Sequence, residues 1–217
     1  MLQAVIFDMD GVLMDTMPMH NKVEIELFQK HGITMTAADF HPFFGMPFQK
    51  LVKTVGLKNG IVLSGTSLEH EKEQLMLQET EPIAPMPGII DLLQKLKHSN
   101  IKTAVGSSTI TSVVQHLLGR AALLPYFDAI ATISDVKQGK PFPDIFLTAA
   151  RQLQTDPSQC LVFEDATSGV QAAKAAGMVC FGYAAASNTA QDLSHADFVF
   201  TDFTKLTLND LKQYFNH

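Results

Sequence analysis

Short apolar runs recur along the chain and alternate with segments of helical periodicity. The runs cover residues 3–8, 101–106, 129–133, 161–164 and 178–181. Apolar runs of about four to eight residues between polar ones are typical of strands buried on both faces of a sheet. Their alternation with helices predicts an α/β fold, in which a parallel sheet carries helices on both faces. The functional site of such a fold lies at the carboxyl ends of the strands.

Several segments between these runs carry the signals of helices. The apolar residues between 89 and 96 keep helical spacing, and Pro87 is expected in the first turn of that helix. Thr167 is expected to cap a helix that continues to Ala176. Gly177 would then supply the left-handed residue that ends it.

Residues 17–84 interrupt the alternation of strands and helices. Pro18 can open a helix that ends at Gly32, and a second helical pattern covers about residues 68–79. No convincing buried strand lies between them. We therefore expect an inserted α-helical cap at 17–84 and an α/β catalytic core formed by 1–16 and 85–217.

The composition argues against two classes of partner. The chain has 217 residues and a net charge of −6, so no basic surplus exists to neutralise a nucleic-acid backbone. No apolar run approaches the roughly 20 residues that span a bilayer, and the first segment turns polar too soon for a signal peptide. We expect no nucleic-acid or membrane partner, and a monomer in the cytoplasm.

The two cysteines and the histidines show no metal-ligand spacing. Cys160 and Cys180 lie in apolar segments, where two buried, reduced thiols are expected, as fits a cytoplasmic protein. The eight histidines are scattered, with no pair at i,i+4. No zinc site is therefore expected.

Asp8 and Asp10 flank Met9 directly after the first predicted strand. Two carboxylates this close repel each other, and a divalent cation bound to their oxygens would relieve the repulsion. Gly11 then lets the chain turn out of the strand. Taken alone, the segment fits a solvated acidic turn as well as it fits a site.

Ser107 follows the second predicted strand, at 101–106. Its hydroxyl and the nearby backbone amides could hold an anion where a strand ends and a helix begins. In isolation, a helix cap is the better interpretation, with Thr109 or Thr111 covering free N–H groups.

Two further segments carry charged residues that could belong to a site. Lys140 lies between Gly139 and Pro141, in a loop that the proline stiffens, although a lone lysine is usually solvated. Glu164 and Asp165 form a second acidic pair at a strand end, which suits a metal site as well as a surface turn.

These four segments together resemble the haloacid dehalogenase superfamily. Their order is Asp-x-Asp, then serine, then lysine, then a late acidic pair, and all would meet at one edge of the sheet. The segments DMDGVLMDT with His20, GKPFPDIF and EDATSGV look like the β-phosphoglucomutase-like phosphatases, whose helical cap follows the first strand. The resemblance implies a Rossmann-like core and a reaction through an aspartyl-phosphate.

The resemblance also implies the chemistry of the two aspartates. Asp8 would attack phosphorus as the nucleophile, and Asp10 would be the general acid and then the general base. The expected function is magnesium-dependent hydrolysis of small-molecule phosphate esters such as sugar phosphates. Dehalogenases and phosphonatases of the superfamily lack the second aspartate, so Asp10 points to phosphate esters.

The remaining roles are likewise implied by the resemblance. Ser107 and Lys140 would hold the oxygens of the transferring phosphoryl group. Glu164 would be a metal ligand or the close support of one. The Mg²⁺ site would then be formed by Asp8, the backbone carbonyl of Asp10, Glu164 and Asp165.

A β-phosphoglucomutase-type isomerase is the alternative function, and a catalytically silent binding module is a third. The mutases use an arginine and a lysine of the cap to bind a second phosphate. An alignment on Gly45 places Phe48 at the arginine position, and Leu75 falls at the lysine position. A small shift of the alignment could restore a cation from Lys50, Lys53 or Lys72.

His20 resembles a cap-hinge histidine, but it fits a polar helix residue nearly as well.

Overall fold

The computed structural model describes residues 1–43, 46, 48–185 and 190–215. Gly45, on which the cap alignment rests, lies outside these residues. The chain forms two compact units, one of Met1–Asp15 with Pro82–His217 and one of Thr16–Glu81. Among the described residues, no helix is both long enough and apolar enough to cross a membrane.

The larger unit is built on a parallel sheet, as the sequence predicts. The order of its strands is β3-β2-β1-β4-β5-β6, and every neighbouring pair is parallel. β6 was not predicted, because three apolar residues are too few to mark a strand. The strands are β1 (Ala4–Phe7), β2 (Lys102–Ser107), β3 (Ala129–Thr132), β4 (Cys160–Glu164), β5 (Val179–Tyr183) and β6 (Phe198–Phe200).

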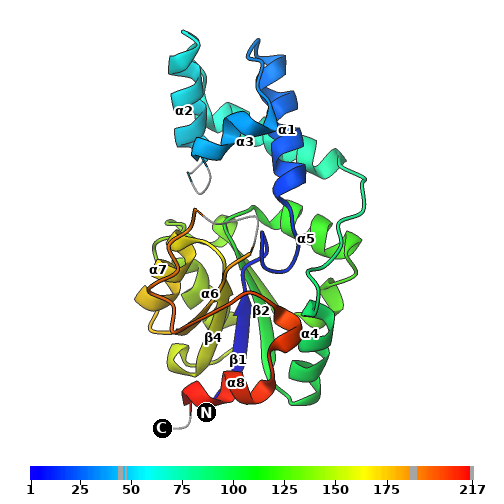
Figure 1. The fold of residues 1–217 in the computed structure, drawn as a ribbon, viewed down its shortest axis with the longest axis vertical. Coiled ribbons are helices and arrows are strands. Elements are labelled where there is room, and N and C mark those ends of the chain that lie inside the picture. The colour runs from blue at the N-terminus through cyan, green and yellow to red at the C-terminus, as the bar shows by residue number, and fades with distance from the viewer. Residues whose placement is uncertain (44–45, 47, 186–189, 216–217) are drawn as a thin grey trace. The chain divides into compact units, whose positions relative to one another are not determined.

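Helices cover both faces of this sheet, and Figure 1 shows α4 and α7 on opposite sides of it. Ile6 of β1 belongs to a core cluster with Phe146 of α6 and Val170 of α7. Phe7 points to the other face and stacks on Phe163. The helices of this unit are α4 (Ile89–His98), α5 (Thr111–Arg120), α6 (Asp144–Gln152), α7 (Thr167–Ala175) and α8 (Leu208–Lys212). The predicted Rossmann-like α/β fold is confirmed.

The strand order reverses between β1 and β4. The chain adds β2 and β3 on one side of β1, and then returns to place β4 on the other side. Phe7 is paired with Phe163, and the N–H of Asp8 donates to the carbonyl of Phe163 at 2.9 Å. The residues that follow β1 and β4 therefore emerge side by side at the point where open α/β sheets bind ligands.

Two predicted helix starts were wrong. α7 begins at Thr167 itself, and the hydroxyl of Thr167 accepts a hydrogen bond from the N–H of Asp192 instead of capping the helix. Pro87 precedes α4, whose N-cap is Gly88. The predicted left-handed residue after α7 is confirmed, with Gly177 at φ 72°.

The smaller unit is helical. α3 packs against both α1 and α2. Pro18 lies in the first turn of α1, as predicted, whereas α2 was not predicted. His20 lies in the same turn and is partly exposed. The helices are α1 (Met17–Lys30), η1 (Ala37–Phe43), α2 (Phe48–Lys58) and α3 (Gly65–Gln78).

The contact between α6 and the sheet generates a prediction for Gly106 of β2. A Cβ there would lie 2.9 Å from two ring atoms of Phe146 and 3.2 Å from Cγ2 of Ile6. Gly106→Ala should therefore lower the free energy of unfolding by about 1–3 kcal/mol through overpacking. Chemical denaturation measures the change.

The control for this prediction is Gly119→Ala in α5, where a Cβ would meet only Leu124, at 3.4 Å. Alanine is the better helix former by roughly 0.5–1 kcal/mol, so this variant should be as stable as the wild type or slightly more stable. Equal destabilisation by both substitutions would contradict the packing described for β2.

Candidate active site

The turn after β1 brings two aspartates to the carboxyl edge of the sheet. Gly11 adopts a left-handed conformation, with φ 80°, and its N–H donates to the carbonyl of Met14 at 2.8 Å. A Cβ at Gly11 would overlap the carboxylate of Asp165. The glycine therefore permits both the turn and the close approach of the loop that follows β4.

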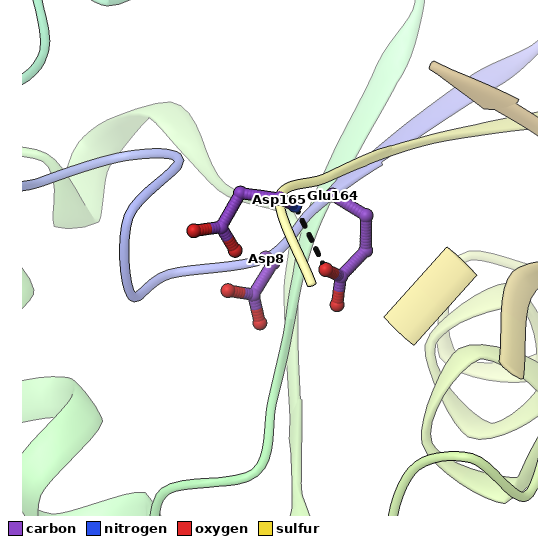
Figure 2. Close-up of side chains that lie close together, drawn as sticks. All are labelled: Asp8, Glu164 and Asp165. Carbon is purple, nitrogen blue, oxygen red and sulfur yellow. Dashed lines mark hydrogen bonds between the residues drawn. The ribbon is translucent and has the colours of Figure 1, made fainter. Parts of the chain in front are cut away.

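Three carboxylates gather where β1 and β4 end. Asp8, Glu164 and Asp165 each offer an oxygen, and these oxygens lie within 4.8 Å of one another. All three residues are buried. Figure 2 shows their carboxylates side by side: Glu164 is the last residue of β4, Asp165 follows it, and Asp8 follows β1. A hard divalent cation such as Mg²⁺ prefers such oxygen ligands, so the residues present fit a metal site.

Lys140 supplies a positive charge to this cluster. Its Nζ lies 2.5 Å from Oδ1 of Asp8 and 2.6 Å from Oε1 of Glu164, and only 5% of its side chain is exposed. The same Nζ lies 4.8 Å from the centre of the Phe146 ring. Lys140 is therefore a buried member of the cluster and not a solvated surface lysine.

The burial of these charges shifts their pKa values. Burial raises the pKa of the Asp8 carboxyl well above its ordinary value, and nearby carboxylates add to this rise, while the Lys140 ammonium opposes it. Burial alone would lower the pKa of Lys140, but the charges and hydrogen bonds of Asp8 and Glu164 outweigh it, so the net shift is upward. The upward shift keeps Lys140 protonated at neutral pH, and its positive charge limits the rise of the Asp8 pKa.

Hydrogen bonds hold both carboxylate oxygens of Glu164 in place. Its Oε2 accepts hydrogen bonds at 2.9 Å from the backbone N–H groups of Asp165 and Ala166, while Oε1 accepts from Lys140. A Cβ at Gly169, in the first turn of α7, would overlap the Glu164 carboxylate. These contacts fix the side chain that positions the ammonium group of Lys140.

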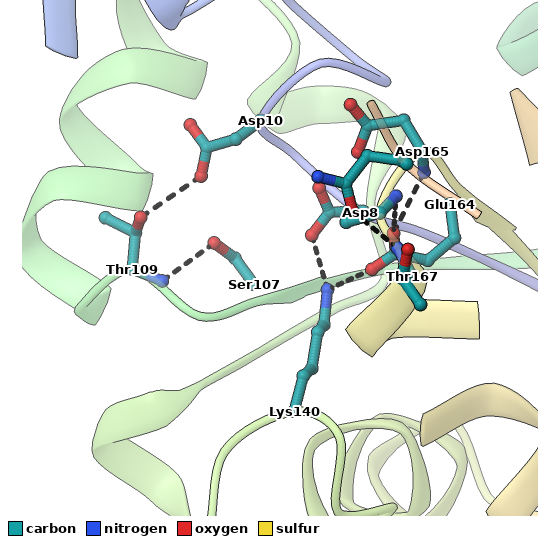
Figure 3. A network of polar contacts seen from close by, with 10 residues as sticks. Asp8, Asp10, Ser107, Thr109, Lys140, Glu164, Asp165 and Thr167 are labelled. Atoms are coloured by element: carbon teal, nitrogen blue, oxygen red, sulfur yellow. Dashed lines mark hydrogen bonds and ion pairs between the residues drawn. The ribbon is translucent and has the colours of Figure 1, made fainter. Parts of the chain in front are cut away.

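Ser107 and Asp10 are joined through one residue of the loop between β2 and α5. The Thr109 N–H donates to Oγ of Ser107 at 3.0 Å, and the Thr109 hydroxyl donates to Oδ2 of Asp10 at 3.1 Å. Figure 3 shows this pair of bonds beside the Lys140 cluster. The alternative role of Thr109 or Thr111 as a helix cap is wrong, because Ile110 is the N-cap of α5 and no side chain caps it.

The structure thus brings the predicted residues together in two groups, and hydrogen bonds or ion pairs link residues within each group. Asp8, Lys140 and the acidic pair form one, and Asp10 with Ser107 forms the other. The sequence interpretation missed Thr109 as a partner of Asp10, and it missed Gly169. A glycine in the first turn of a predicted helix was the available signal, since glycine disfavours helices and permits close approach.

The cysteines lie outside this chemistry. Cys160 and Cys180 are buried, as expected, and they are not bonded to each other. Burial raises the pKa of the Cys160 thiol to about 12, and the nearby Asp156 adds to that shift. This shift favours the protonated thiol at neutral pH, which is a poorer nucleophile than the thiolate.

Comparison with known proteins identifies the family to which this chain is similar. Residues 5–183 match the model of the haloacid dehalogenase-like hydrolases. The fructose-1-phosphate phosphatase YqaB of Escherichia coli is 35% identical over 81% of this chain and 93% of its own. The β-phosphoglucomutase of Bacillus subtilis is 32% identical over 98% of this chain and 95% of its own.

A solved structure shares the fold over nearly the whole chain. CbbY from Rhodobacter sphaeroides, crystallised in complex with phosphate, superposes with a TM-score of 0.83 at 28% identity, and the match covers 95% of this chain and 96% of CbbY. The parallel sheet, the acidic cluster at its edge and the match to the family model all indicate the same family. The chain belongs to the haloacid dehalogenase-like hydrolase family.

Proposed function

We propose that this protein is a magnesium-dependent phosphatase that hydrolyses small-molecule phosphate esters, with sugar phosphates as the expected class. The reaction would proceed through an aspartyl-phosphate on Asp8. The observation that carries the proposal is the buried Asp8 carboxylate, bonded to Lys140 inside an acidic cluster at the strand-order reversal. The E. coli relative that carries the name fructose-1-phosphate phosphatase supports the same class of substrate.

The reaction requires a carboxylate to approach a phosphate dianion. Two unit negative charges 4 Å apart repel each other by about 4 kcal/mol at an effective dielectric of 20. Lys140, already bonded to Asp8, would offset part of this repulsion and bind a phosphoryl oxygen. A Mg²⁺ ion held by Asp8, Asp165 and the backbone carbonyl of Asp10 would supply further positive charge at the transferring group. Glu164 would support this arrangement, because it already accepts three hydrogen bonds.

Two proton transfers would then fall to Asp10. As Asp8 forms a bond to phosphorus, the bond to the ester oxygen breaks and Asp10 donates a proton to that oxygen. In the second half, Asp10 takes a proton from a water molecule that attacks the aspartyl-phosphate, and Asp8 is released. The Ser107 hydroxyl would hold a phosphoryl oxygen in both steps.

The proposed catalytic residues all belong to the larger unit. We assign the chemistry to residues 1–16 and 85–217, and the selection of a small phosphorylated metabolite to a cap of residues 17–84. Two buried cysteines without a disulfide support a reducing, cytoplasmic setting. The expected active form is a monomer, since all the proposed groups lie on one chain.

The isomerase alternative draws support from the similarity to β-phosphoglucomutase. It requires cations in the smaller unit that bind a second phosphate. Lys72 is engaged there, with Nζ bonded to Oε1 of Glu24 at 2.5 Å and 4.4 Å from the centre of the Phe48 ring. Leu75, which the alignment places at the lysine position of the mutases, is apolar and buried. These contacts favour the hydrolase.

The buried ion pairs of Lys140 generate a stability prediction. Lys140→Met leaves Asp8 and Glu164 buried without their cation, so the free energy of unfolding at neutral pH should fall by about 3–5 kcal/mol. Urea denaturation in metal-free buffer measures it. The control is Lys174→Met, whose partner Asp197 is 30% exposed and whose pair should contribute less than about 1 kcal/mol. Similar losses for the two variants would contradict the role given to Lys140.

Asp8→Asn and metal removal test the proposed chemistry. The amide is a poor nucleophile and a weaker metal ligand, so Asp8→Asn should release no phosphate above background, while its circular dichroism spectrum stays that of the wild type. EDTA should abolish the activity of the wild type, and added Mg²⁺ should restore it. Phosphate release from p-nitrophenyl phosphate and from fructose 1-phosphate is the measurement. Sustained turnover by the metal-free wild type would contradict the proposed metal-dependent mechanism.

The choice between hydrolase and mutase rests on what attacks the aspartyl-phosphate. Incubation with β-glucose 1-phosphate, Mg²⁺ and a trace of the 1,6-bisphosphate should release inorganic phosphate, with little glucose 6-phosphate, because the apolar Phe48 and Leu75 stand at the two positions where the mutases carry cations. Enzyme-coupled assays quantify both products. Rapid formation of glucose 6-phosphate with little phosphate release would favour the mutase over the hydrolase. Lys50 or Lys53 would then be the expected cation for the second phosphate.

A further inference from the structure

We propose that Thr109 is a positioning residue for the proton transfer by Asp10. The inference rests on the proposed function, because it assumes that Asp10 is the acid for the leaving group. Thr109 lies in the loop between β2 and α5, and its side chain meets a residue 99 positions away in the sequence. No motif of the sequence marks this contact.

The first argument is the geometry of the hydroxyl. Oγ1 of Thr109 donates to Oδ2 of Asp10 at 3.1 Å. A carboxyl group can carry its proton on either oxygen, and donation to Oδ2 favours the proton on Oδ1. The hydroxyl therefore contributes to the direction of the carboxyl group and favours one oxygen as the site from which the proton leaves.

The second argument is the other bond of the same residue. The backbone N–H of Thr109 donates to Oγ of Ser107 at 3.0 Å, and Ser107 is fully buried. One residue thus joins the proposed phosphoryl-binding serine to the proposed acid. Because a misplacement of about 1 Å can cost roughly a hundredfold in rate, a shared anchor for these two groups matters to catalysis.

The step that depends on this anchor is the first transfer. The Asp8 carboxylate forms a bond to phosphorus, the bond from phosphorus to the ester oxygen breaks, and the proton of Asp10 moves to that oxygen. A sugar alkoxide needs this proton, whereas p-nitrophenolate leaves without it. Loss of the Thr109 hydroxyl should therefore harm the two substrates unequally.

A structural role for Thr109 makes a different prediction, and the helix that follows the loop supplies a control. Thr111, the first residue of α5, shares a hydrogen bond of 2.7 Å with the hydroxyl of Thr132. Thr111→Val removes a hydroxyl that braces the loop and does not contact Asp10 in the interactions described. If Thr109 only braced the loop, its loss would resemble that of Thr111.

The experiment compares kcat/KM on fructose 1-phosphate and on p-nitrophenyl phosphate, with Mg²⁺, for the wild type and four variants, because kcat/KM covers only the steps up to the departure of the leaving group. Thr109→Val and Thr109→Ala remove the hydroxyl in two ways, so that one misfolded variant does not end the test. Thr109→Ser keeps the hydroxyl, and Thr111→Val is the control. We expect Thr109→Val and Thr109→Ala to lose at least about tenfold more kcat/KM on fructose 1-phosphate than on p-nitrophenyl phosphate. Thr109→Ser and Thr111→Val should keep the wild-type ratio.

The outcomes separate this inference from the proposed function. An equal loss on both substrates, no loss at all, or a Thr109→Ser variant as impaired as Thr109→Val would overturn the positioning role while the phosphatase assignment stands. A wild type without Mg²⁺-dependent release from either substrate would overturn the proposed function, and the inference with it.

Discussion

The buried contact of Lys140 with Asp8 and Glu164 is the interaction on which the site depends. It joins the ends of two strands that lie far apart in the sequence, at distances of 2.5 and 2.6 Å. Acidic groups packed this closely repel one another, and burial strengthens the repulsion. Lys140 makes the arrangement stable, and the remaining negative charge makes it a good place for a divalent cation. The proposed chemistry and the predicted stability therefore depend on the same contact.

The backbone around this contact is shaped to allow it. The reversal of strand order places β4 beside β1, so the two acidic loops emerge together. Gly11 and Gly169 lack the Cβ atoms that would overlap the carboxylates of Asp165 and Glu164. Backbone N–H groups then orient Glu164. The site is thus a consequence of sheet topology, two close approaches and one buried cation.

Much of this arrangement could be predicted from the sequence, and the failures have physical causes. The acidic pairs follow strongly apolar strands, so periodicity placed Asp8 and Glu164 at the same edge of the sheet. The start of α7 was misplaced because the Thr167 hydroxyl bonds to Asp192, a partner 25 residues away. The bond between Thr109 and Asp10 also crosses a long stretch of chain, and local propensity contains no information about it. β6 is only three residues long, and its place depends on pairing with β5.

The most direct test of the central claim is to detect the phosphoryl group on Asp8. The protein would be mixed with fructose 1-phosphate and Mg²⁺, quenched in acid within the first turnover, and digested for peptide mass spectrometry. The account predicts a phosphorylated peptide whose modified residue is Asp8, and none in Asp8→Asn. Phosphate release by the wild type without any phosphorylated peptide, or with the modification on another residue, would contradict the account.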